Sequence, residues 1–294
     1  MYITVFTPTY NRGYIIEQLY HSLQRQTYQD FEWIVIDDGS TDDTERKFQI
    51  FENDNNHFPI TYKKVKNGGK HRAINLGVKM AQGEMFFIVD SDDYLTDDAL
   101  ENIVRIEDTI PKDQKTQFAG VCGECGYSID QIMGTTFAGD TLDITMLDRK
   151  KNGITGDKAE VFYTDILKKY PFPEFEGENF ITECVVWDKI AADGYMLRFF
   201  NKIIYIAEYL EDGLTKNSFA MFDKNPKGYG LYIYQCGLYG QICGVNKWNR
   251  YLNFYYQFRR RLSFTDISKA LNMNPVKLRL RILGLQLFYK LYDR

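Results

Sequence analysis

The stretch Met85-Phe86-Phe87-Ile88-Val89-Asp90-Ser91-Asp92-Asp93 decides the fold. Its first five residues are all apolar, which predicts a strand buried on both faces of a sheet. Three carboxylates follow at the point where the strand leaves the sheet. Carboxylate oxygens suit hard cations such as Mn²⁺ or Mg²⁺, and such an ion commonly shares its shell with substrate phosphates. A loop with a helix-capping aspartate is the alternative, and we favour the metal site because polar strand ends recur nearby.

Strand and helix patterns alternate in the residues before this stretch. The predicted strands are Tyr2–Thr7, Phe31–Ile36 and Ile60–Val65, and the predicted helices are Tyr14–Gln26, Thr41–Glu52 and Lys70–Ala81. Apolar strands that alternate with amphipathic helices predict an α/β fold, a mostly parallel sheet flanked by helices. In such sheets ligands bind beyond the C-terminal ends of the strands.

Polar motifs stand just past these predicted strand ends. They are Thr7-Pro8-Thr9-Tyr10-Asn11-Arg12, Asp37-Asp38-Gly39-Ser40, Asn67-Gly68-Gly69-Lys70 and Asp90-Ser91-Asp92-Asp93. Because the C-terminal ends of parallel strands meet at one edge of a sheet, we expect the four motifs to line one crevice.

In this order and spacing, the four motifs resemble the signatures of family-2 glycosyltransferases, which have the Rossmann-like GT-A fold. The resemblance covers residues 1 to 100 strongly and 100 to 215 weakly. It implies an inverting, metal-dependent transfer of a sugar from a nucleotide diphosphate sugar, with a UDP-sugar as the expected donor. The implied acceptor is a hydroxyl of a saccharide or lipid-linked saccharide, in the synthesis of cell-surface polysaccharide.

The resemblance also implies which residues bind the donor. Thr7, Pro8 and Thr9 would form the floor of the nucleotide pocket, and Asp38, with Asp37 near it, would contact the base or ribose. Asp90 would contact the ribose or the donor sugar, next to Ser91. Asp92 would bind the divalent metal that bridges the diphosphate, with Asp90 as the second candidate ligand.

The sequence departs from the family pattern in the helix that follows Asn67-Gly68-Gly69. Many relatives carry an arginine directly before the asparagine of that helix, where this chain has Ile74 before Asn75. Lys70 and Arg72 are instead clustered at the helix start, so we assign the base and phosphate contacts to them. The alternative for both residues is a solvated helix end.

An inverting transferase also needs a general base for the acceptor hydroxyl. In the family this is an acidic residue that opens a helix in the second half. Glu183 has that position, although Cys184 stands where relatives often carry a second acid, and Glu178 is the competing candidate. Glu183 could also merely favour a helix N-terminus. The resemblance further implies that a loop at Asp212-Gly213-Leu214-Thr215 folds over the donor diphosphate, where Lys216 could assist the leaving group or lie on the surface.

Charge is distributed unevenly along the 294 residues. The net charge is −4, which does not favour nucleic acid as a partner, but residues 246–294 contain 11 Lys and Arg against 2 Asp and Glu. That balance of +9 leaves −13 on the first 245 residues. We expect a catalytic domain at residues 1–224 and a helical, basic and aromatic extension at 225–294.

The last predicted helix, Val276–Tyr292, interleaves leucines with basic residues. Basic charge beside a broad apolar face is typical of contact with an anionic membrane surface. Packing on the catalytic domain or in a homodimer explains the pattern equally well. Five cysteines without regular spacing, no signal peptide and no long apolar run predict a cytoplasmic protein, with peripheral membrane contact open.

Two other functions fit parts of the pattern. A sugar nucleotidyltransferase also combines a parallel sheet, a metal and a nucleotide, but its glycine-rich, arginine-bearing loop is missing where Thr7-Pro8-Thr9 stands. A non-catalytic nucleotide-sugar-binding or scaffold protein is supported only by the incomplete motif at Glu183. Cys122-Gly123-Glu124-Cys125 has metal-ligand spacing, but a structural zinc site needs four ligands and no second pair occurs.

Overall fold

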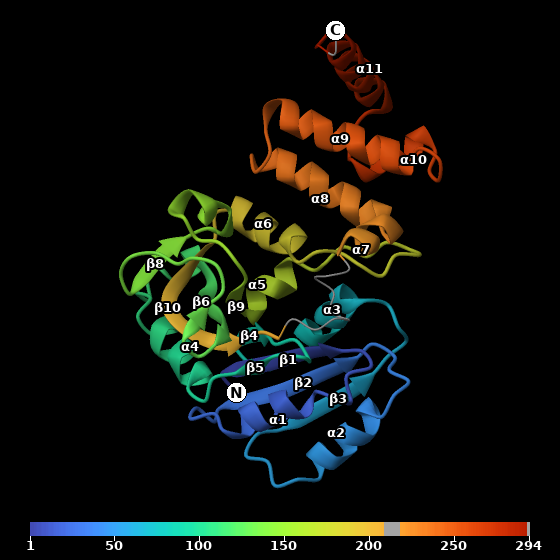
Figure 1. Ribbon diagram of the computed structural model, residues 1–294. Helices are drawn as coiled ribbons and strands as arrows, with labels where there is room; N and C mark the ends of the chain where they lie inside the picture. The colour runs from blue at the N-terminus through green and yellow to red at the C-terminus, as the bar shows by residue number, and fades with distance from the viewer. Residues whose placement is uncertain (209–217, 293–294) are drawn as a thin grey trace.

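A computed structural model describes residues 1–208 and 218–292 (Figure 1). The loop at Asp212-Gly213-Leu214-Thr215 and Lys216 lie outside the described residues. The first hundred residues form the expected alternation of strands and helices. Their elements are β1 (Ile3–Thr9), α1 (Glu17–Gln24), β2 (Phe31–Asp37), α2 (Thr44–Glu52), β3 (Ile60–Lys64), α3 (Lys70–Met80), β4 (Met85–Ile88), β5 (Tyr94–Leu95) and α4 (Ala99–Glu107).

The middle of the chain adds the other half of the sheet. Its longer elements are β6 (Phe118–Ser128), β9 (Lys158–Tyr163), α5 (Thr164–Lys169), α6 (Cys184–Ala192) and β10 (Met196–Ile206). Short strands β7 (Gln131–Ile132) and β8 (Thr141–Ile144) pair with β6 and β10. Two 3₁₀ turns, η2 (Met146–Asp148) and η3 (Lys150–Asn152), lie between β8 and β9.

The main sheet has the strand order β3-β2-β1-β4-β9-β6-β10-β5. It is parallel from β3 to β4, and β6 and β10 are also parallel to each other. Strand β9 runs antiparallel to both β4 and β6, and β5 runs antiparallel to β10, so the sheet is mostly parallel, as the sequence predicts, with two reversed strands. The middle of the chain joins its strands without regular crossover helices, and antiparallel pairing becomes possible there.

Strand β1 continues through Pro8 to Thr9, beyond the stop expected at the proline. Proline lacks the N–H that a central strand donates to its neighbours. Here the pairing of β1 with β4 ends at Phe6 and Ile88, so beyond that point β1 pairs only with β2. Pro8 is tolerated because the strand has become an edge on one side.

Two apolar clusters cover the two faces of the sheet. The first contains Trp33, Phe48 and Phe87 beneath α1, α2 and α4, and the second contains Phe6, Phe86 and Phe162 beneath α3 and α6. Continuous apolar strands such as β4 are therefore covered on both sides, as their composition predicts. Cys122 and Cys125 are buried free thiols inside β6, away from any helix start.

The C-terminal extension is helical, as expected. Its helices are α7 (Ser218–Lys224), α8 (Pro226–Leu238), α9 (Gly244–Phe258), α10 (Phe264–Ala270) and α11 (Pro275–Tyr292). A third apolar cluster that includes Phe254, Phe258 and Leu278 holds α8 to α11 together. Figure 1 shows these helices stacked beyond α6, with α11 farthest from the sheet. None of the described helices is long and apolar enough to cross a bilayer.

Candidate active site

A cavity of about 2110 Å³ opens beyond the C-terminal ends of β1, β2 and β4. All four polar strand ends contribute to its lining, through Pro8, Thr9, Asp38, Asn67, Gly69, Lys70, Asp90, Ser91, Asp92 and Asp93. Ligand pockets in proteins commonly measure about 300–1,000 Å³. This cavity therefore has room for more than one small substrate.

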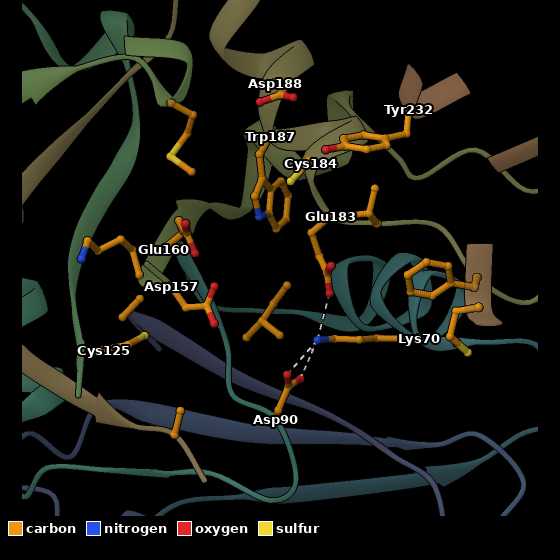
Figure 2. Close-up of a pocket in the computed structure, with 18 of the residues that line it drawn as sticks. Lys70, Asp90, Cys125, Asp157, Glu160, Glu183, Cys184, Trp187, Asp188 and Tyr232 are labelled. Atoms are coloured by element: carbon orange, nitrogen blue, oxygen red, sulfur yellow. Dashed lines mark hydrogen bonds and ion pairs between the residues drawn. The ribbon is translucent and has the colours of Figure 1, made fainter. Parts of the chain in front are cut away.

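Lys70 lies in the wall of this cavity and contacts two of its carboxylates. Its Nζ lies 2.8 Å from both Asp90 carboxylate oxygens and 2.9 Å from Glu183 Oε1 (Figure 2). Burial alone would lower the pKa of Lys70, but the charges of Asp90 and Glu183 raise it well above its usual value. Asp90 follows β4, and Glu183 stands just before α6, so one ammonium connects the first and second halves of the chain.

Glu183 has the position expected of the base. It is the residue before α6, and its side chain is 32% exposed in the cavity lining. Burial opposes ionisation, but the ion pair with Lys70 outweighs it and lowers the pKa of Glu183. The carboxylate is therefore ionised and able to accept a proton.

Glu178 has a different position and a different task. Its two carboxylate oxygens accept hydrogen bonds from the backbone N–H groups of Lys227 at 2.7 Å and Gly228 at 2.9 Å. These are first-turn amides of α8, so Glu178 satisfies donors that a helix start leaves unpaired. The side chain is buried and does not line the cavity.

Arg72 likewise points into the protein. Its guanidinium donates to the carbonyls of Glu178 at 2.7 Å and Phe175 at 2.8 Å, and to the carbonyl of Gly68. Arg72 is absent from the cavity lining and braces the segment that leads to Glu183. The phosphate contact that the sequence suggested for Arg72 has no support in this arrangement.

The segment from Glu178 to Glu183 is held from two further sides. Asn225, which is 1% exposed, accepts hydrogen bonds from the N–H groups of Asn179 at 2.8 Å and Phe180 at 3.2 Å. Gly69, at φ +97°, approaches Asn179 so closely that an added Cβ would lie 1.8 Å from the Asn179 carbonyl oxygen. A side chain at Gly69 would therefore displace the segment that carries Glu183.

The two neighbouring aspartates at the end of β2 face different ways. Asp37 is fully buried outside the cavity lining, where its carboxylate accepts from the Ser40 N–H at 2.7 Å and from the Tyr62 hydroxyl. Asp38 lines the cavity, and its oxygens accept from the N–H groups of Gly68 at 2.7 Å and Gly69 at 2.8 Å. Asp38 therefore both shapes the Asn67-Gly68-Gly69 turn and borders the cavity.

Of the three residues at the end of β1 that were expected to form the floor of the nucleotide pocket, two border the cavity and one does not. Thr7 is buried, and its hydroxyl accepts from Trp33 Nε1 at 3.0 Å outside the cavity lining. Pro8 and Thr9 border the cavity. The Thr9 hydroxyl is buried and has no hydrogen-bond partner among the described residues, which leaves a polar atom available to a ligand.

The acidic motif after β4 gathers three carboxyl groups at the cavity wall. Both oxygens of the Asp93 carboxyl group already have hydrogen-bond partners. The Tyr205 hydroxyl donates to one oxygen at 2.5 Å, and the Glu208 N–H donates to the other at 2.8 Å. Burial and the charge of Asp90 raise the pKa of Asp93 to about 8 and also raise the pKa of Asp92. Asp92 lies 3.8 Å from the Arg12 guanidinium, beyond hydrogen-bonding distance.

These residues fit a hard divalent cation that completes its shell with substrate. Among the described residues no three His, Cys, Asp or Glu side chains are grouped to hold a metal by themselves. Mg²⁺ in particular is usually held by one or two carboxylates together with substrate phosphates and water. Asp92 offers a cavity-facing carboxylate of this kind, whereas both Asp90 oxygens already contact Lys70.

The cavity continues past Glu183 into a second half that the strand-end motifs did not predict. Its lining includes Arg149, Asp157, Glu160, Trp187, Asp188, Tyr232 and Arg250. Figure 2 shows Glu160, Asp157 and Trp187 across the cavity from Lys70. Burial raises the pKa of Glu160 to about 7. The Arg149 guanidinium lies 3.7 Å from the Glu160 carboxylate.

His71 follows Lys70 and makes stability depend on pH. It is 1% exposed, and neither ring nitrogen has a hydrogen-bond partner among the described residues. Burial, with the charge of Arg72, lowers the pKa of His71 to about 4. The unfolded imidazole titrates near 6.5, so below that pH the unfolded state gains a proton that the folded state does not. Stability is therefore lost as the pH falls from about 7 towards 4.

Between pH 7.5 and pH 5 the free energy of unfolding of the unmodified chain is expected to fall. In the His71→Leu variant this fall should be smaller by about 1–2 kcal/mol. Urea unfolding at the two pH values measures this difference. The same change at His21, which is exposed on α1, is the matched control for the loss of one imidazole. Identical pH dependence in the His71→Leu variant and the unmodified chain would contradict the assignment.

Comparison with known proteins agrees with the fold. The sequence model of glycosyl transferase family 2 matches residues 4–160. The GalNAc(5)-diNAcBac-PP-undecaprenol beta-1,3-glucosyltransferase of Campylobacter jejuni is 29% identical over 193 residues, 63% of this chain and 58% of that protein. The chain spans less than two thirds of the length of the curated relatives that it matches.

Two solved structures share the fold. Residues 1–349 of Staphylococcus aureus TarS in complex with UDP-GlcNAc superpose with a TM-score of 0.59 at 20% identity, covering 89% of this chain and 73% of that one. The mannosyltransferase PcManGT of Pyrobaculum calidifontis in complex with GDP-Man and Mn²⁺ has a TM-score of 0.54 at 18% identity, covering 99% and 81%. Both likenesses establish the arrangement of the chain as a mixed α/β fold.

Proposed function

We propose a reaction from one premise: this chain belongs to glycosyl transferase family 2, whose sequence model matches more than half of its length. The proposed reaction is the inverting transfer of a sugar from a UDP-sugar to a hydroxyl of a saccharide or lipid-linked saccharide. The observation that carries it is the Lys70 bridge, because it brings a donor-side carboxylate, Asp90, and an ionised base, Glu183, to one ammonium in one cavity.

The donor half of the cavity suits a nucleotide. Pro8, Thr9 and Asp38 border it at the ends of β1 and β2, and the Thr9 hydroxyl offers an unused polar atom. Asp38 can accept from a ribose or base only by sharing oxygens that already receive the Gly68 and Gly69 amides. The complex of TarS with UDP-GlcNAc supports a uridine nucleotide as the donor.

Asp92 is the residue proposed to hold Mn²⁺ or Mg²⁺, with Asp90 beside it. Bound there, the ion supplies positive charge against the diphosphate as it departs. The Mn²⁺ complex of the mannosyltransferase PcManGT supports this choice of cation. The positive charges of Arg12 and Lys70 line the same wall and offset the same developing charge.

Glu183 is proposed to remove the proton from the acceptor hydroxyl. The acceptor oxygen then forms a bond to the anomeric carbon, and the bond from that carbon to the diphosphate oxygen breaks. The electron pair leaves with the nucleoside diphosphate, and the proton remains on Glu183. Lys70 keeps Glu183 ionised and fixes the direction of its carboxylate before the proton moves.

The acceptor is proposed to lie in the second half of the cavity, beside Trp187 and Glu160. A carboxylate accepts strong hydrogen bonds from sugar hydroxyls, and an indole ring offers apolar surface to a sugar face. Trp187 packs against Phe162 and Phe172, with ring centroids 4.4 Å and 5.6 Å apart. These contacts fix its ring as part of the wall of this half. Both residues lie on the Glu183 side of the donor, where an attacking hydroxyl must be.

At a pH of about 8.5, above the Glu160 pKa of about 7, replacing Glu160 with Gln is expected to raise the acceptor KM by about tenfold, because a charged hydrogen-bond acceptor becomes neutral. Donor affinity is expected to change less than the acceptor KM, since the Glu160 carboxylate lies across the cavity from Lys70 and Asp90 although β9 pairs with β4 (Figure 2). Initial rates at varied acceptor concentration, with saturating donor, measure the change. A rise in the donor KM instead of the acceptor KM would contradict the acceptor assignment and would mean that Glu160 contacts the donor.

A thermal-shift panel of nucleotide sugars, with and without Mn²⁺, tests the proposed donor. A ligand that binds only the native state stabilises it by about 2.7 kcal/mol at a hundredfold excess over its Kd. We expect UDP-sugars to raise the melting temperature, and Mn²⁺ to increase that rise. Stabilisation by no nucleotide sugar would contradict the proposal, and a GDP-sugar as the best ligand would replace the uridine assignment.

A further inference from the structure

Helix α11 has two apolar faces, and along residues 275–287, whose side chains the structure describes, one of them is covered and the other is exposed. Leu278 is fully buried and Ile282 is 6% exposed, and both belong to the third apolar cluster, which packs α11 against α9 and α10. These residues are four positions apart and so lie on the same side of the helix. The extension therefore holds α11 in place without using its other side.

On the other side four large apolar side chains face solvent. Val276 is 67% exposed, Leu280 65%, Leu283 50% and Leu287 62%. Their spacings of four, three and four residues place them in one line along the helix, which we call the α11 stripe. Monomeric soluble proteins rarely expose a continuous apolar surface of this kind without a partner.

Basic side chains border the α11 stripe on both sides. At 100° per residue, Lys277 and Arg281 flank it on one side and Arg279 on the other, and all three are exposed. Arg279 and Arg281 are anchored over the rings of Phe264 at 5.1 Å and Trp248 at 4.6 Å. The sequence of α11 contains no Asp or Glu. The surface thus presents a line of apolar groups between cationic edges.

We propose that the α11 stripe docks on the surface of a bilayer that contains anionic lipids. Helices with a basic edge and an exposed apolar line bury that line at the boundary between headgroups and acyl chains. Each basic residue near an anionic surface adds to the attraction. A second copy of this chain is a poorer occupant, because pairing two stripes would place basic edges together with no acidic residue on either helix.

Docking in this way would orient the whole molecule. The first 245 residues carry −13 and would be repelled by an anionic surface, whereas the region that contains α11 carries the positive charge. Figure 1 places α11 at the end of the molecule opposite β3. Helix α8, between them, contributes Tyr232 to the second half of the cavity. The acceptor half would therefore lie nearer the bilayer than the donor half.

Vesicle flotation with the full chain tests the proposal independently of any transfer reaction. One set of vesicles contains only phosphatidylcholine, and the other contains roughly a third phosphatidylglycerol. We expect binding to the anionic vesicles, with at least a tenfold loss in the double variant Leu280→Gln/Leu283→Gln and a similar loss when the salt concentration rises to roughly 0.5 M. Ile50→Gln, which changes an apolar residue that is 56% exposed on α2, is expected to bind like the unmodified chain.

Three results would overturn the proposal. The first is no binding of the unmodified chain to anionic vesicles, and the second is equal binding by the double variant and the unmodified chain. The third is a sedimentation analysis in which the unmodified chain is a dimer and the double variant is a monomer, since a second copy of the chain would then cover the α11 stripe. Because the changed leucines are exposed, the double variant should melt within a few degrees of the unmodified chain, which confirms that it is folded.

Discussion

Replacing Glu183 with Gln is expected to lower the rate of sugar transfer by about 10²–10⁴-fold, the usual contribution of a general base. The amide keeps the size of the side chain but cannot take the acceptor proton. Donor affinity should change little, because the residues at the ends of β1, β2 and β4 are untouched. The rate is measured as nucleoside diphosphate released from the best donor, with a saccharide mixture or water as the acceptor.

Glu178→Gln is the matched control, since it makes the same chemical change five residues away. It weakens the cap on α8, which should cost about 1 kcal/mol of stability, but it removes no group from the cavity. Most of the transfer activity should survive. Full transfer in Glu183→Gln, with loss in Glu178→Gln, would make Glu178 the base.

Replacing Asp92 with Ala is expected to lower metal-dependent turnover by about a hundredfold or more, because several kcal/mol of charge stabilisation depend on the ion. The metal-free protein should keep or gain stability, since burial and the neighbouring charge of Asp90 already raise the pKa of Asp92. Titration of Mn²⁺ in the presence of a UDP-sugar, followed by thermal shift and by product release, measures both effects.

Asp97→Ala is the control for Asp92. Asp97 is 60% exposed, pairs with Arg25 at 2.9 Å and lies outside the cavity lining. It should respond to Mn²⁺ like the unmodified chain. Unchanged metal dependence in Asp92→Ala would contradict the metal assignment and would leave Asp90 as the carboxylate to test.

The donor side of the site could be predicted from the sequence because it depends on local pattern. An apolar strand followed by acids, as in Met85–Asp93, predicts both burial and the strand end from consecutive residues. Parallel strands then bring such ends together, as the shared lining of the cavity by Thr9, Asp38 and Asp92 shows. The pattern does not say which of two adjacent residues faces the ligand, so Asp37 and Thr7 were expected beside a donor although both are buried outside the cavity.

The contacts that hold the segment carrying Glu183 could not be predicted, because they join residues that are far apart in the chain. Arg72 holds carbonyls more than a hundred positions away, and Asn225 reaches back to Asn179. A basic residue at a helix start has the same local pattern whether it binds phosphate or braces a loop. Asn225-Pro226 was a usable signal for the start of α8, but nothing local points from it to Glu178.

The extension shows the same limit in another form. The leucines and basic residues of Val276–Tyr292 predicted a helix, and α11 is that helix. Only packing on α9 and α10 separates its covered residues, such as Leu278, from its exposed ones, such as Leu280. The division at residue 224 stays a prediction, since α8 contributes both to the third apolar cluster and to the cavity.

Release of nucleoside diphosphate from UDP-sugars by the purified chain tests the central claim most directly. The assay needs no knowledge of the acceptor, because water can replace it slowly. We predict release that requires Mn²⁺ or Mg²⁺ and that falls by about a hundredfold or more in Asp92→Ala and in Glu183→Gln, with donor binding retained in Glu183→Gln. Donor binding without any release by the unmodified chain, even with saccharide acceptors, would contradict the account and make the chain a binding protein.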